Sequence, residues 1–459
     1  MKLTRRLFLF VLLGVFGYLF SYAWRALPII SGYGAKDVCS CVMLAGRTPN
    51  DVLQNEVGRF PLSLGSFAVD YHDSSVTENV FGLARRKAIY RKGLGCTLIS
   101  EMSEQELRHQ NFNLAKTVNI NTDTISWPAG DRLRNSFIPG INYPALNQAL
   151  ESAFSEPGEK KLRRTRALVV VYDGQIIAER YADGFNRNSK QIGWSMTKSI
   201  TNAFVGILVK EGKLKLDAPA PVESWKNDER STITLNDLMH ASSGLKWDEN
   251  YAGPSGATNM LFKKKDMGIY AALSPLRDEP GKVFYYSSGT SNIISRIIRE
   301  TVGDQDYYKF PYEQLFNKIR MFSVVMEPDA GGTFVGSSYS FATARDWARF
   351  GLLYLNDGVW NGERILPEGW VKYTSTPTPG ALVGQYGAQF WLNAGAPGNP
   401  KHRTYPDAPP DLFTADGFEG QNVWIIPSRK LVISRLSLQQ GNHLDENKFL
   451  KDILNALPH

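Results

Sequence analysis

Cysteine and histidine are scarce in this chain of 459 residues, which contains three cysteines and six histidines. The histidines show neither H-E-x-x-H nor H-x-H spacing, and none lies at ligand spacing from the cysteines. Glycine-rich pieces such as residues 331–332 lack the lysine of a phosphate-binding P-loop. We therefore expect neither a metal ion nor a cofactor.

Long runs of one charge are also missing. The 52 lysines and arginines exceed the 45 acidic residues by only seven, and the basic clusters at residues 160–164 and 263–265 are short. Aromatic residues do not interleave with these clusters, so we interpret them as solvated surface and expect no nucleic-acid partner. The composition is that of a globular protein, with 43% apolar residues. The length exceeds the roughly 250–300 residues at which a single core stops growing, so we expect more than one domain.

One long apolar run is present, at residues 7–24, which carry no charge and follow Lys2, Arg5 and Arg6. Such a run is long enough to span a bilayer, and the preceding positive charges keep residues 1–6 in the cytoplasm. Residues 21–23 (SYA) form a passable signal-peptidase site, so a cleaved signal peptide is the alternative. Because the run is longer than a usual signal core, we favour an uncleaved anchor in a bacterial inner membrane, with the rest of the chain in the periplasm.

The three cysteines, Cys39, Cys41 and Cys96, all lie within the first hundred residues. If this region is exported, an oxidising compartment permits one local disulfide. Cys96 then pairs with Cys39 or with Cys41, and the sequence does not distinguish the two. A metal site at the three thiols is disfavoured because no histidine completes it.

The pattern along the chain predicts two folded regions after the apolar run. Residues 31–135 contain short alternating segments with turn residues between them, which favours a small α+β or β-rich domain. Residues 119–142 are rich in Asn, Asp, Pro and Gly and predict a linker. The second domain is expected over residues 143–459.

Within residues 143–459 the signals are stronger. Two alternating segments flank Asp173-Gly174 and predict a β-hairpin over residues 166–181. A helix is predicted over residues 196–210, closed by Gly212, and paired strands over residues 422–434. Strands at both ends of the domain with helices between them predict an α+β fold with an antiparallel sheet.

Ser195 and Lys198 begin the predicted helix three residues apart. Residues i and i+3 share one helix face, so the lysine amine can lie beside the serine hydroxyl and take its proton. A helix N-terminus also stabilises developing negative charge. By itself this spacing favours an ordinary helix start with a solvated lysine over a catalytic pair.

Further sequence segments follow Ser195 and Lys198 in a fixed order. Taken with this pair, they make the chain resemble the serine β-lactamase and penicillin-binding protein superfamily. The resemblance is closest to the class C-like branch that includes family VIII esterases and 6-aminohexanoate-dimer hydrolases. The segments are 195–198 (SMTK), 234–245 (TLNDLMHASSGL), 280–288 (PGKVFYYSS), 343–351 (TARDWARFG) and 361–370 (NGERILPEGW).

The resemblance implies roles for three residues. Ser195 would be the acylated nucleophile and Lys198 its proton partner, and Tyr286 would share the general-base role. Because Tyr286 follows Phe284 and Tyr285, the alternative is a core aromatic residue. The implied fold is a β-lactamase-like antiparallel sheet flanked by helices, with a helical subdomain, preceded by the small N-terminal domain and the membrane-spanning helix.

The chain departs from the family pattern at two substrate-contacting positions. Ser288 stands where many relatives carry asparagine. The third motif aligns with residues 415–417, followed by Phe418, and lacks the cation that holds a β-lactam carboxylate. The backbone after Gly417 would supply the second oxyanion N–H. Asp416 is then either a solvated turn residue or a substrate contact, in the latter case for an amine-bearing substrate.

We therefore expect a serine hydrolase that cleaves a small amide or ester through an acyl-enzyme. The alternatives are a penicillin-binding or sensor protein that is acylated without turnover, a true β-lactamase, which the missing cation disfavours, and a pseudoenzyme. The expected partners are a small-molecule amide or ester and, through residues 7–24, a membrane.

Overall fold

The computed structural model describes residues 2–116, 118–134, 137–158, 162–396, 399–441 and 443–458. Met1 of the predicted cytoplasmic segment, the first two residues of the basic cluster at 160–164 and His459 lie outside the described residues. The chain forms two compact units. The first comprises Met1–Gln110, Asp248–Asp266 and Asp329–Gly332, and the second comprises Asn111–Trp247, Met267–Pro328 and Thr333–His459.

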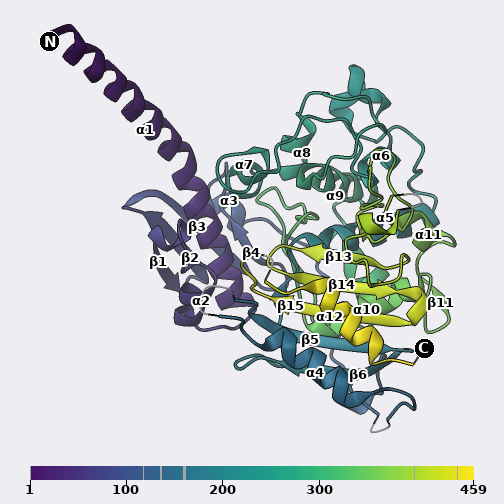
Figure 1. Ribbon diagram of the computed structural model, residues 1–459. Coiled ribbons are helices and arrows are strands. Elements are labelled where there is room, and N and C mark those ends of the chain that lie inside the picture. The colour runs from purple at the N-terminus through teal and green to yellow at the C-terminus, as the bar shows by residue number, and fades with distance from the viewer. Residues whose placement is uncertain are drawn as a thin grey trace. The chain divides into compact units, whose positions relative to one another are not determined.

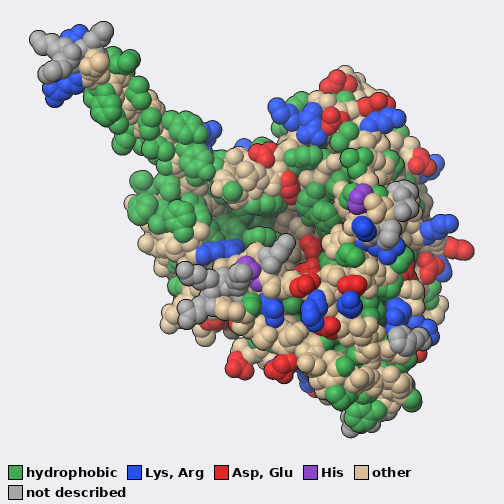
Figure 2. All heavy atoms as spheres, viewed as in Figure 1, with side chains coloured by type: hydrophobic (Ala, Val, Ile, Leu, Met, Phe, Trp, Pro, Cys, Tyr) green, Lys and Arg blue, Asp and Glu red, His purple; other side chains and the backbone are tan. Residues whose placement is uncertain are grey.

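The first unit begins with helix α1 (Lys2–Cys39), which is longer than the predicted run of residues 7–24. Its N-terminal half is exposed, and apolar side chains gather along it (Figure 2). By length and composition this helix is able to cross a membrane, as a membrane anchor or a signal sequence does. The helix continues past Trp24 because the following residues carry a buried face; Pro28 lies inside it.

The C-terminal half of α1 packs on a four-stranded antiparallel sheet (Figure 1). The buried side chains of Ala35 and Val38 belong to this contact region. A disulfide joins Cys39, the last residue of α1, to Cys96 on the fourth strand, while Cys41 is buried and forms no disulfide within the described residues. Of the two predicted pairings, the structure therefore contains the one with Cys39. The sheet has the order β1 (Gly65–Asp70), β2 (Ser75–Val80), β3 (Leu83–Arg91) and β4 (Gly95–Leu98), and the helices of this unit after α1 are α2 (Pro49–Asn55), α3 (Glu104–Arg108) and α7 (Gly256–Lys263).

A carboxyl group is enclosed between α1 and this sheet. Glu78 on β2 has no exposed surface, and a Cβ on either Gly34 or Gly65 would overlap its carboxyl oxygens. Burial raises the pKa of Glu78 to about 9. Because Gly34 and Gly65 have no side chain, the carboxyl group of Glu78 fits between them in its neutral form.

The second unit is built on a six-stranded antiparallel sheet. Helix α10 (Ala344–Leu355) covers one face, and α4 (Tyr143–Phe154) and α12 (Glu446–Asn455) pack together on the other (Figure 1). The side chains between α4, α12 and the sheet form a core that includes Leu168, Trp424 and Ile433. The strand order is β12 (Trp391–Leu392), β13 (Phe413–Gly417), β14 (Gln421–Ile426), β15 (Leu431–Ser437), β5 (Thr165–Tyr172) and β6 (Gln175–Tyr181).

A helical region accompanies the sheet, and α9 (Ser288–Val302) lies at its centre, in contact with its neighbours α5, α6 and α8. The helices of this region are α5 (Thr197–Lys210), α6 (Leu235–Met239), α8 (Met267–Ala272) and α11 (Trp370–Thr374). Small sheets complete the unit: β7 (Gln191–Ile192), β9 (Ser340–Ala342) and β8 (Val325–Met326) in one, and β10 (Val359–Trp360) and β11 (Glu363–Arg364) in the other.

The predicted α+β class is confirmed, and so are the local elements on which it was based. The hairpin β5–β6 turns at Asp173 and Gly174, which adopt the positive φ values of 45° and 76° that such a turn needs. Helix α5 ends shortly before Gly212, whose φ is 72°. Strands β14 and β15 pair as predicted.

Candidate active site

Ser195 lies on a single 3-10 turn, Trp194–Met196, directly before α5. The turn is tightly held: a Cβ on Gly193 would overlap the Trp347 ring, and the Thr197 hydroxyl donates to the Trp194 carbonyl at 2.7 Å. Trp194 has a φ of 45°, a costly conformation for a bulky residue that persists only where the surroundings impose it. The half-buried Ser195 is therefore presented on a strained, well-supported turn.

Lys198 points at this serine from the first turn of α5. Its side chain is only 2% exposed, and its Nζ lies 3.0 Å from Ser195 Oγ. The same amine donates to Ser288 Oγ at 3.1 Å and to the Ser337 carbonyl at 3.0 Å. The lysine is thus held by three separate segments of the second unit and is not solvated.

Ser288 and Ser337 fix the far side of the lysine amine. Ser288 is fully buried at the start of α9, so its hydroxyl faces Lys198. Asn292, one turn later, donates to Ser337 Oγ at 3.1 Å and accepts from the Ser337 backbone N–H at 3.2 Å. Ser337 and Asn292 were not predicted, because Ser337 contacts the lysine through its backbone carbonyl and Asn292 meets Ser337 only through tertiary packing.

Tyr286 lies over the same lysine, with the ring centroid 4.8 Å from Lys198 Nζ. Its half-buried ring stacks on Trp391 at 5.2 Å and meets Tyr386 edge-on at 5.8 Å. Of its two aromatic neighbours in sequence, Phe284 packs against Tyr386, whereas Tyr285 is 36% exposed. Tyr286 therefore belongs to an aromatic wall and also borders the Ser195–Lys198 pair.

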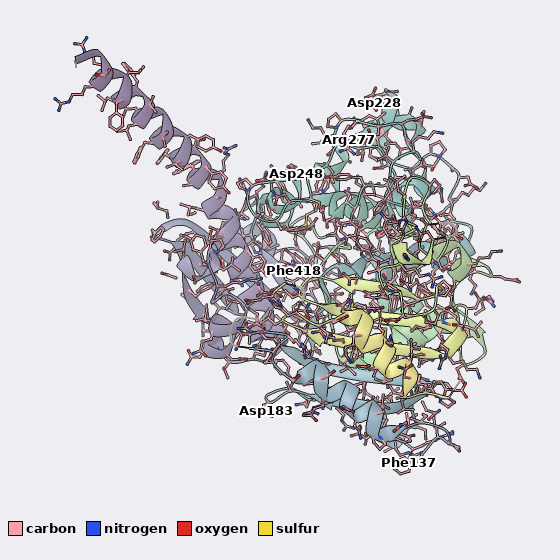
Figure 3. The ribbon with its side chains drawn as sticks, viewed as in Figure 1. Phe137, Asp183, Asp228, Asp248, Arg277 and Phe418 are labelled. Atoms are coloured by element: carbon pink, nitrogen blue, oxygen red, sulfur yellow. A yellow bond between two sulfur atoms is a disulfide. The ribbon has the colours of Figure 1, made fainter. Side chains whose placement is uncertain are left out.

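The third predicted segment lies on β13, which runs alongside the Ser195 turn. A Cβ on Gly417 would overlap the carbonyl oxygen of Gly193, so the strand edge and the turn approach as closely as glycine allows. Phe418 follows β13 (Figure 3); it is 52% exposed and meets the Trp194 ring edge-on at 6.0 Å. Asp416 is half-buried and accepts a hydrogen bond from Asn422 Nδ2 at 2.7 Å.

A cavity of about 550 Å³ opens beside these residues. Asp416, Gly417 and Phe418 line it together with Trp391 and Glu446, the first residue of α12. Burial, and then the nearby Glu446, raise the pKa of Asp416 to about 8, and burial likewise raises the pKa of Glu446. Asp416 is therefore a cavity-lining residue and not a solvated turn residue. Glu446 was not predicted, because it lies thirty positions after the motif with no local signal.

His240 lies at the end of α6. Its Nδ1 is 2.9 Å from the Thr378 hydroxyl, and its ring meets Tyr373 edge-on at 5.1 Å. Burial lowers the pKa of His240 to about 4. Within the described residues, no three His, Cys, Asp or Glu side chains are grouped so as to hold a metal ion.

The fold agrees with comparisons against known proteins. The chain belongs to the Beta-lactamase family, whose model matches residues 150–455, and it is thus a hydrolase of the serine β-lactamase fold. The predicted resemblance to this superfamily is confirmed.

Its relatives include amide and ester hydrolases. A 6-aminohexanoate-dimer hydrolase of Paenarthrobacter ureafaciens is 24% identical over 327 residues, which cover 64% of this chain and 75% of the relative. A solved structure from Bacillus anthracis, provisionally described as a 6-aminohexanoate-dimer hydrolase, is 24% identical with a TM-score of 0.56, covering 76% of this chain and 89% of that one. A family VIII carboxylesterase structure is 13% identical with a TM-score of 0.52, covering 71% of this chain and all of the other. The two structures show the same fold.

Proposed function

We propose that this protein hydrolyses an amide or ester bond through an acyl-enzyme on Ser195. The observation that carries the proposal is the 3.0 Å contact between Lys198 Nζ and Ser195 Oγ, since a serine hydroxyl needs a base within hydrogen-bond reach. Burial of Lys198 supports the role, because its amine is held beside Ser195 and does not extend into solvent.

In the proposed mechanism Ser195 Oγ attacks the substrate carbonyl carbon while its proton passes to Lys198 or Tyr286. The oxyanion is held by the backbone N–H groups of Ser195 and of Phe418, which follows Gly417. Lys198 and Tyr286 then deliver the proton to the leaving nitrogen or oxygen as its bond to the carbonyl carbon breaks. Water, deprotonated by the same pair, attacks the acyl group, releases a carboxylic acid and restores the serine hydroxyl.

The substrate class follows from the third segment. Ala415 stands where the aligned motif of β-lactam-binding relatives carries a cation, so residues 415–417 offer no cationic partner to the carboxylate of a β-lactam. A short linear amide, as the name of the Paenarthrobacter ureafaciens relative implies for that protein, or a simple ester fits this position better. Ser288 is buried at the start of α9, and its hydroxyl accepts from Lys198 Nζ, which serves to hold the lysine in place.

We further propose that residues 143–459 form the hydrolase domain and residues 31–135 a separate small domain. The exposed apolar half of α1 would anchor the chain in a bacterial inner membrane through residues 7–24, with residues 1–6 in the cytoplasm and the hydrolase domain in the periplasm. The Cys39–Cys96 disulfide supports an oxidising compartment.

The test is the Ser195→Ala variant in a p-nitrophenyl ester assay, run beside a panel of linear amides, D-amino-acid peptides and β-lactams. We expect loss of turnover and of fluorophosphonate labelling, with an unchanged melting temperature. Ser199→Ala is the matched control, because Ser199 lies on α5, the helix that follows Ser195, and its hydroxyl donates to the Gln389 backbone carbonyl. Unchanged hydrolysis by Ser195→Ala would disprove the mechanism. A persistent adduct on Ser195 without product would instead identify a protein that is acylated without turnover.

A further inference from the structure

The turn between β2 and β3 presents two large apolar side chains to solvent. Val80 pairs with Leu83, so the turn itself consists of Phe81 and Gly82. The side chain of Phe81 is 72% exposed and that of Leu83 is 53% exposed. A methyl group on Gly82 would meet no atom within 4 Å. The tip of this hairpin therefore projects from the first unit with an apolar surface.

Phe81 adopts a backbone conformation that does not suit its side chain. Its φ is 54° and that of Gly82 is 73°, as in a type I′ turn, whose first residue is usually Asn, Asp or Gly. The β5–β6 hairpin has the same geometry and follows this rule with Asp173. A bulky residue with a positive φ costs stability, and an exposed ring regains little of it by packing. Strain of this kind is typical of functional positions.

Two bonds define the direction in which α1 runs over the sheet. The Ser31 hydroxyl donates to the carbonyl of Ala84, near the start of β3. Further along α1, Cys39 is bonded to Cys96, which pairs with Tyr90 near the end of β3. Following α1 backwards from Ser31 therefore leads toward the β2–β3 turn and past it.

The turn reaches about as far in this direction as the end of the apolar run at residues 7–24. From Ser31 back to Trp24 the helix advances about 10 Å. From Ala84 back to Phe81 an extended strand also advances about 10 Å. Figure 2 shows apolar side chains where the exposed half of α1 meets the rest of the first unit. The medium that surrounds Trp24, whose side chain is 66% exposed, therefore also faces Phe81.

The folded part of the first unit begins at the same level of α1. The Tyr22 hydroxyl lies against Gly253, where a Cβ would come within 2.6 Å of it. Residues 4–21 of the helix are exposed on every side. Tyr22 and Trp24 are aromatic residues of the kind that marks a membrane–water boundary, and Arg25 follows them. In a membrane-inserted chain, the bilayer surface therefore lies near Trp24.

Lipid fits this apolar surface better than a second protein does. Two exposed apolar side chains are too few for the core of a stable protein–protein interface. The exposed side chains of Arg25 and Arg85 lie close in sequence to the apolar groups and are long enough to reach lipid phosphates. The acidic residues Asp70 and Asp73 lie at the opposite end of the sheet, in and beside the β1–β2 turn.

We propose that the β2–β3 turn inserts Phe81 and Leu83 into the bilayer surface beside α1. The first unit is thereby held against the membrane at a second point, which a single helix does not provide. The insertion rests on the proposed anchoring of the chain by residues 7–24 and is independent of the chemistry at Ser195.

The test uses the full chain in nanodiscs of phosphatidylcholine and phosphatidylglycerol, with one chain in each disc. Leu83→Cys and Tyr71→Cys are labelled separately with a nitrobenzoxadiazole thiol probe, and the unmutated chain, whose Cys41 is buried, gives the background. Tyr71 is the matched control, because it is 64% exposed in the β1–β2 turn at the other end of the same sheet. We expect lipids with nitroxide-labelled acyl chains to quench the probe on Leu83→Cys and not the probe on Tyr71→Cys.

Phe81→Asn separates insertion from a structural role. Asparagine is favoured at this position of the turn, so the melting temperature should not fall. Burial of a phenylalanine side chain favours the inserted state by about tenfold or more, so the probe on Leu83→Cys should lose most of its quenching in this background. Unchanged quenching in Phe81→Asn would overturn the insertion of Phe81.

The remaining outcomes distinguish insertion from anchoring and from hydrolysis. Resistance to alkaline carbonate extraction reports the anchor, and the p-nitrophenyl ester assay reports Ser195. A chain that resists extraction while the probe on Leu83→Cys stays in water overturns insertion alone. Equal quenching of the probes on Leu83→Cys and Tyr71→Cys also overturns it, because the helix would then act only as a tether. A probe shielded only in discs that hold two chains would identify a second copy as the partner and overturn the lipid contact.

Discussion

Lys198 Nζ lies 3.0 Å from Ser195 Oγ, and the lysine side chain that makes this contact is almost completely buried. Because the Ser337 carbonyl and the Ser288 hydroxyl accept from the same amine, its position is fixed from three directions. Such preorganisation lets a proton pass between lysine and serine without rearrangement of either side chain.

Lys198→Met should lower kcat/KM for a p-nitrophenyl ester by roughly 10²–10⁴, because the variant keeps the length of the side chain but not its base. Lys210→Met, at the exposed end of the same helix, should retain activity. Steady-state kinetics with both variants decide the matter. A Lys198→Met enzyme with near-normal kcat would mean that another group activates Ser195.

Tyr286→Phe should lower kcat by about 10² or more while leaving KM nearly unchanged. The ring remains stacked on Trp391, so the wall of the site is preserved and only the hydroxyl is lost. Tyr285→Phe, whose ring is 36% exposed beside Arg277, provides the control. A rise in KM without a change in kcat would assign Tyr286 to substrate binding alone.

Gly417→Ala should reduce kcat strongly and also lower the melting temperature. A methyl group there would overlap the Gly193 carbonyl and push the edge of β13 away from the Ser195 turn, which enlarges the proposed oxyanion site. Gly158→Ala, where a methyl group meets no atom within 4 Å, serves as the reference. Full activity in Gly417→Ala would show that the turn and the strand tolerate separation.

His240 should make the fold sensitive to acid. Burial lowers the pKa of His240 from 6.5 to about 4, so the folded state holds the ring neutral while the unfolded chain takes up a proton below about pH 6.5. The stability due to the neutral ring is therefore complete above pH 6.5 and is lost as the pH falls toward 4, by about 3 kcal/mol in all. Between pH 7.5 and pH 4.5 the melting temperature of the wild type should fall further than that of His240→Gln. Parallel profiles would contradict this.

The Cys39–Cys96 pairing predicts a simple chemical result. Alkylation of the unreduced, denatured protein should modify Cys41 alone, as read by peptide mass spectrometry. Because the bridge closes a sequence separation of 57 residues, replacing both bridged cysteines by alanine should destabilise the first unit by about 4 kcal/mol. Modification of Cys39 in the unreduced protein would assign the bridge to Cys41.

The parts of the fold that were predictable are those that local chemistry determines. The β5–β6 hairpin follows from Asp173-Gly174, and the capping box of α6 follows from Thr234 and Asp237, which exchange hydrogen bonds as that pattern requires. Helix α5 follows from its apolar run and Gly212. Each of these signals lies within a few residues of the element that it defines.

The parts that were not predictable depend on contacts between distant segments. The Ser337 carbonyl and Glu446 reach the site through tertiary packing, and neither carries a motif. The positive φ of Trp194 contradicts the usual preference of a bulky residue and follows from its surroundings. Helix α1 extends to Cys39, beyond the apolar run of residues 7–24, because such a run marks an apolar stretch and not the ends of a helix.

Helix α1 joins its exposed half to its buried half without a loop between them. A helix advances about 1.5 Å and turns about 100° with each residue, so the two halves share a fixed phase. One residue inserted between Trp24 and Pro28 would rotate every apolar side chain before it by about 100° relative to the β1–β4 sheet. It would also move these side chains about 1.5 Å along the helix axis, away from the sheet. Helix α1 therefore sets the rotational orientation of its exposed apolar half, which a flexible linker would not do. The disulfide at Cys39 fixes the C-terminal end of the helix.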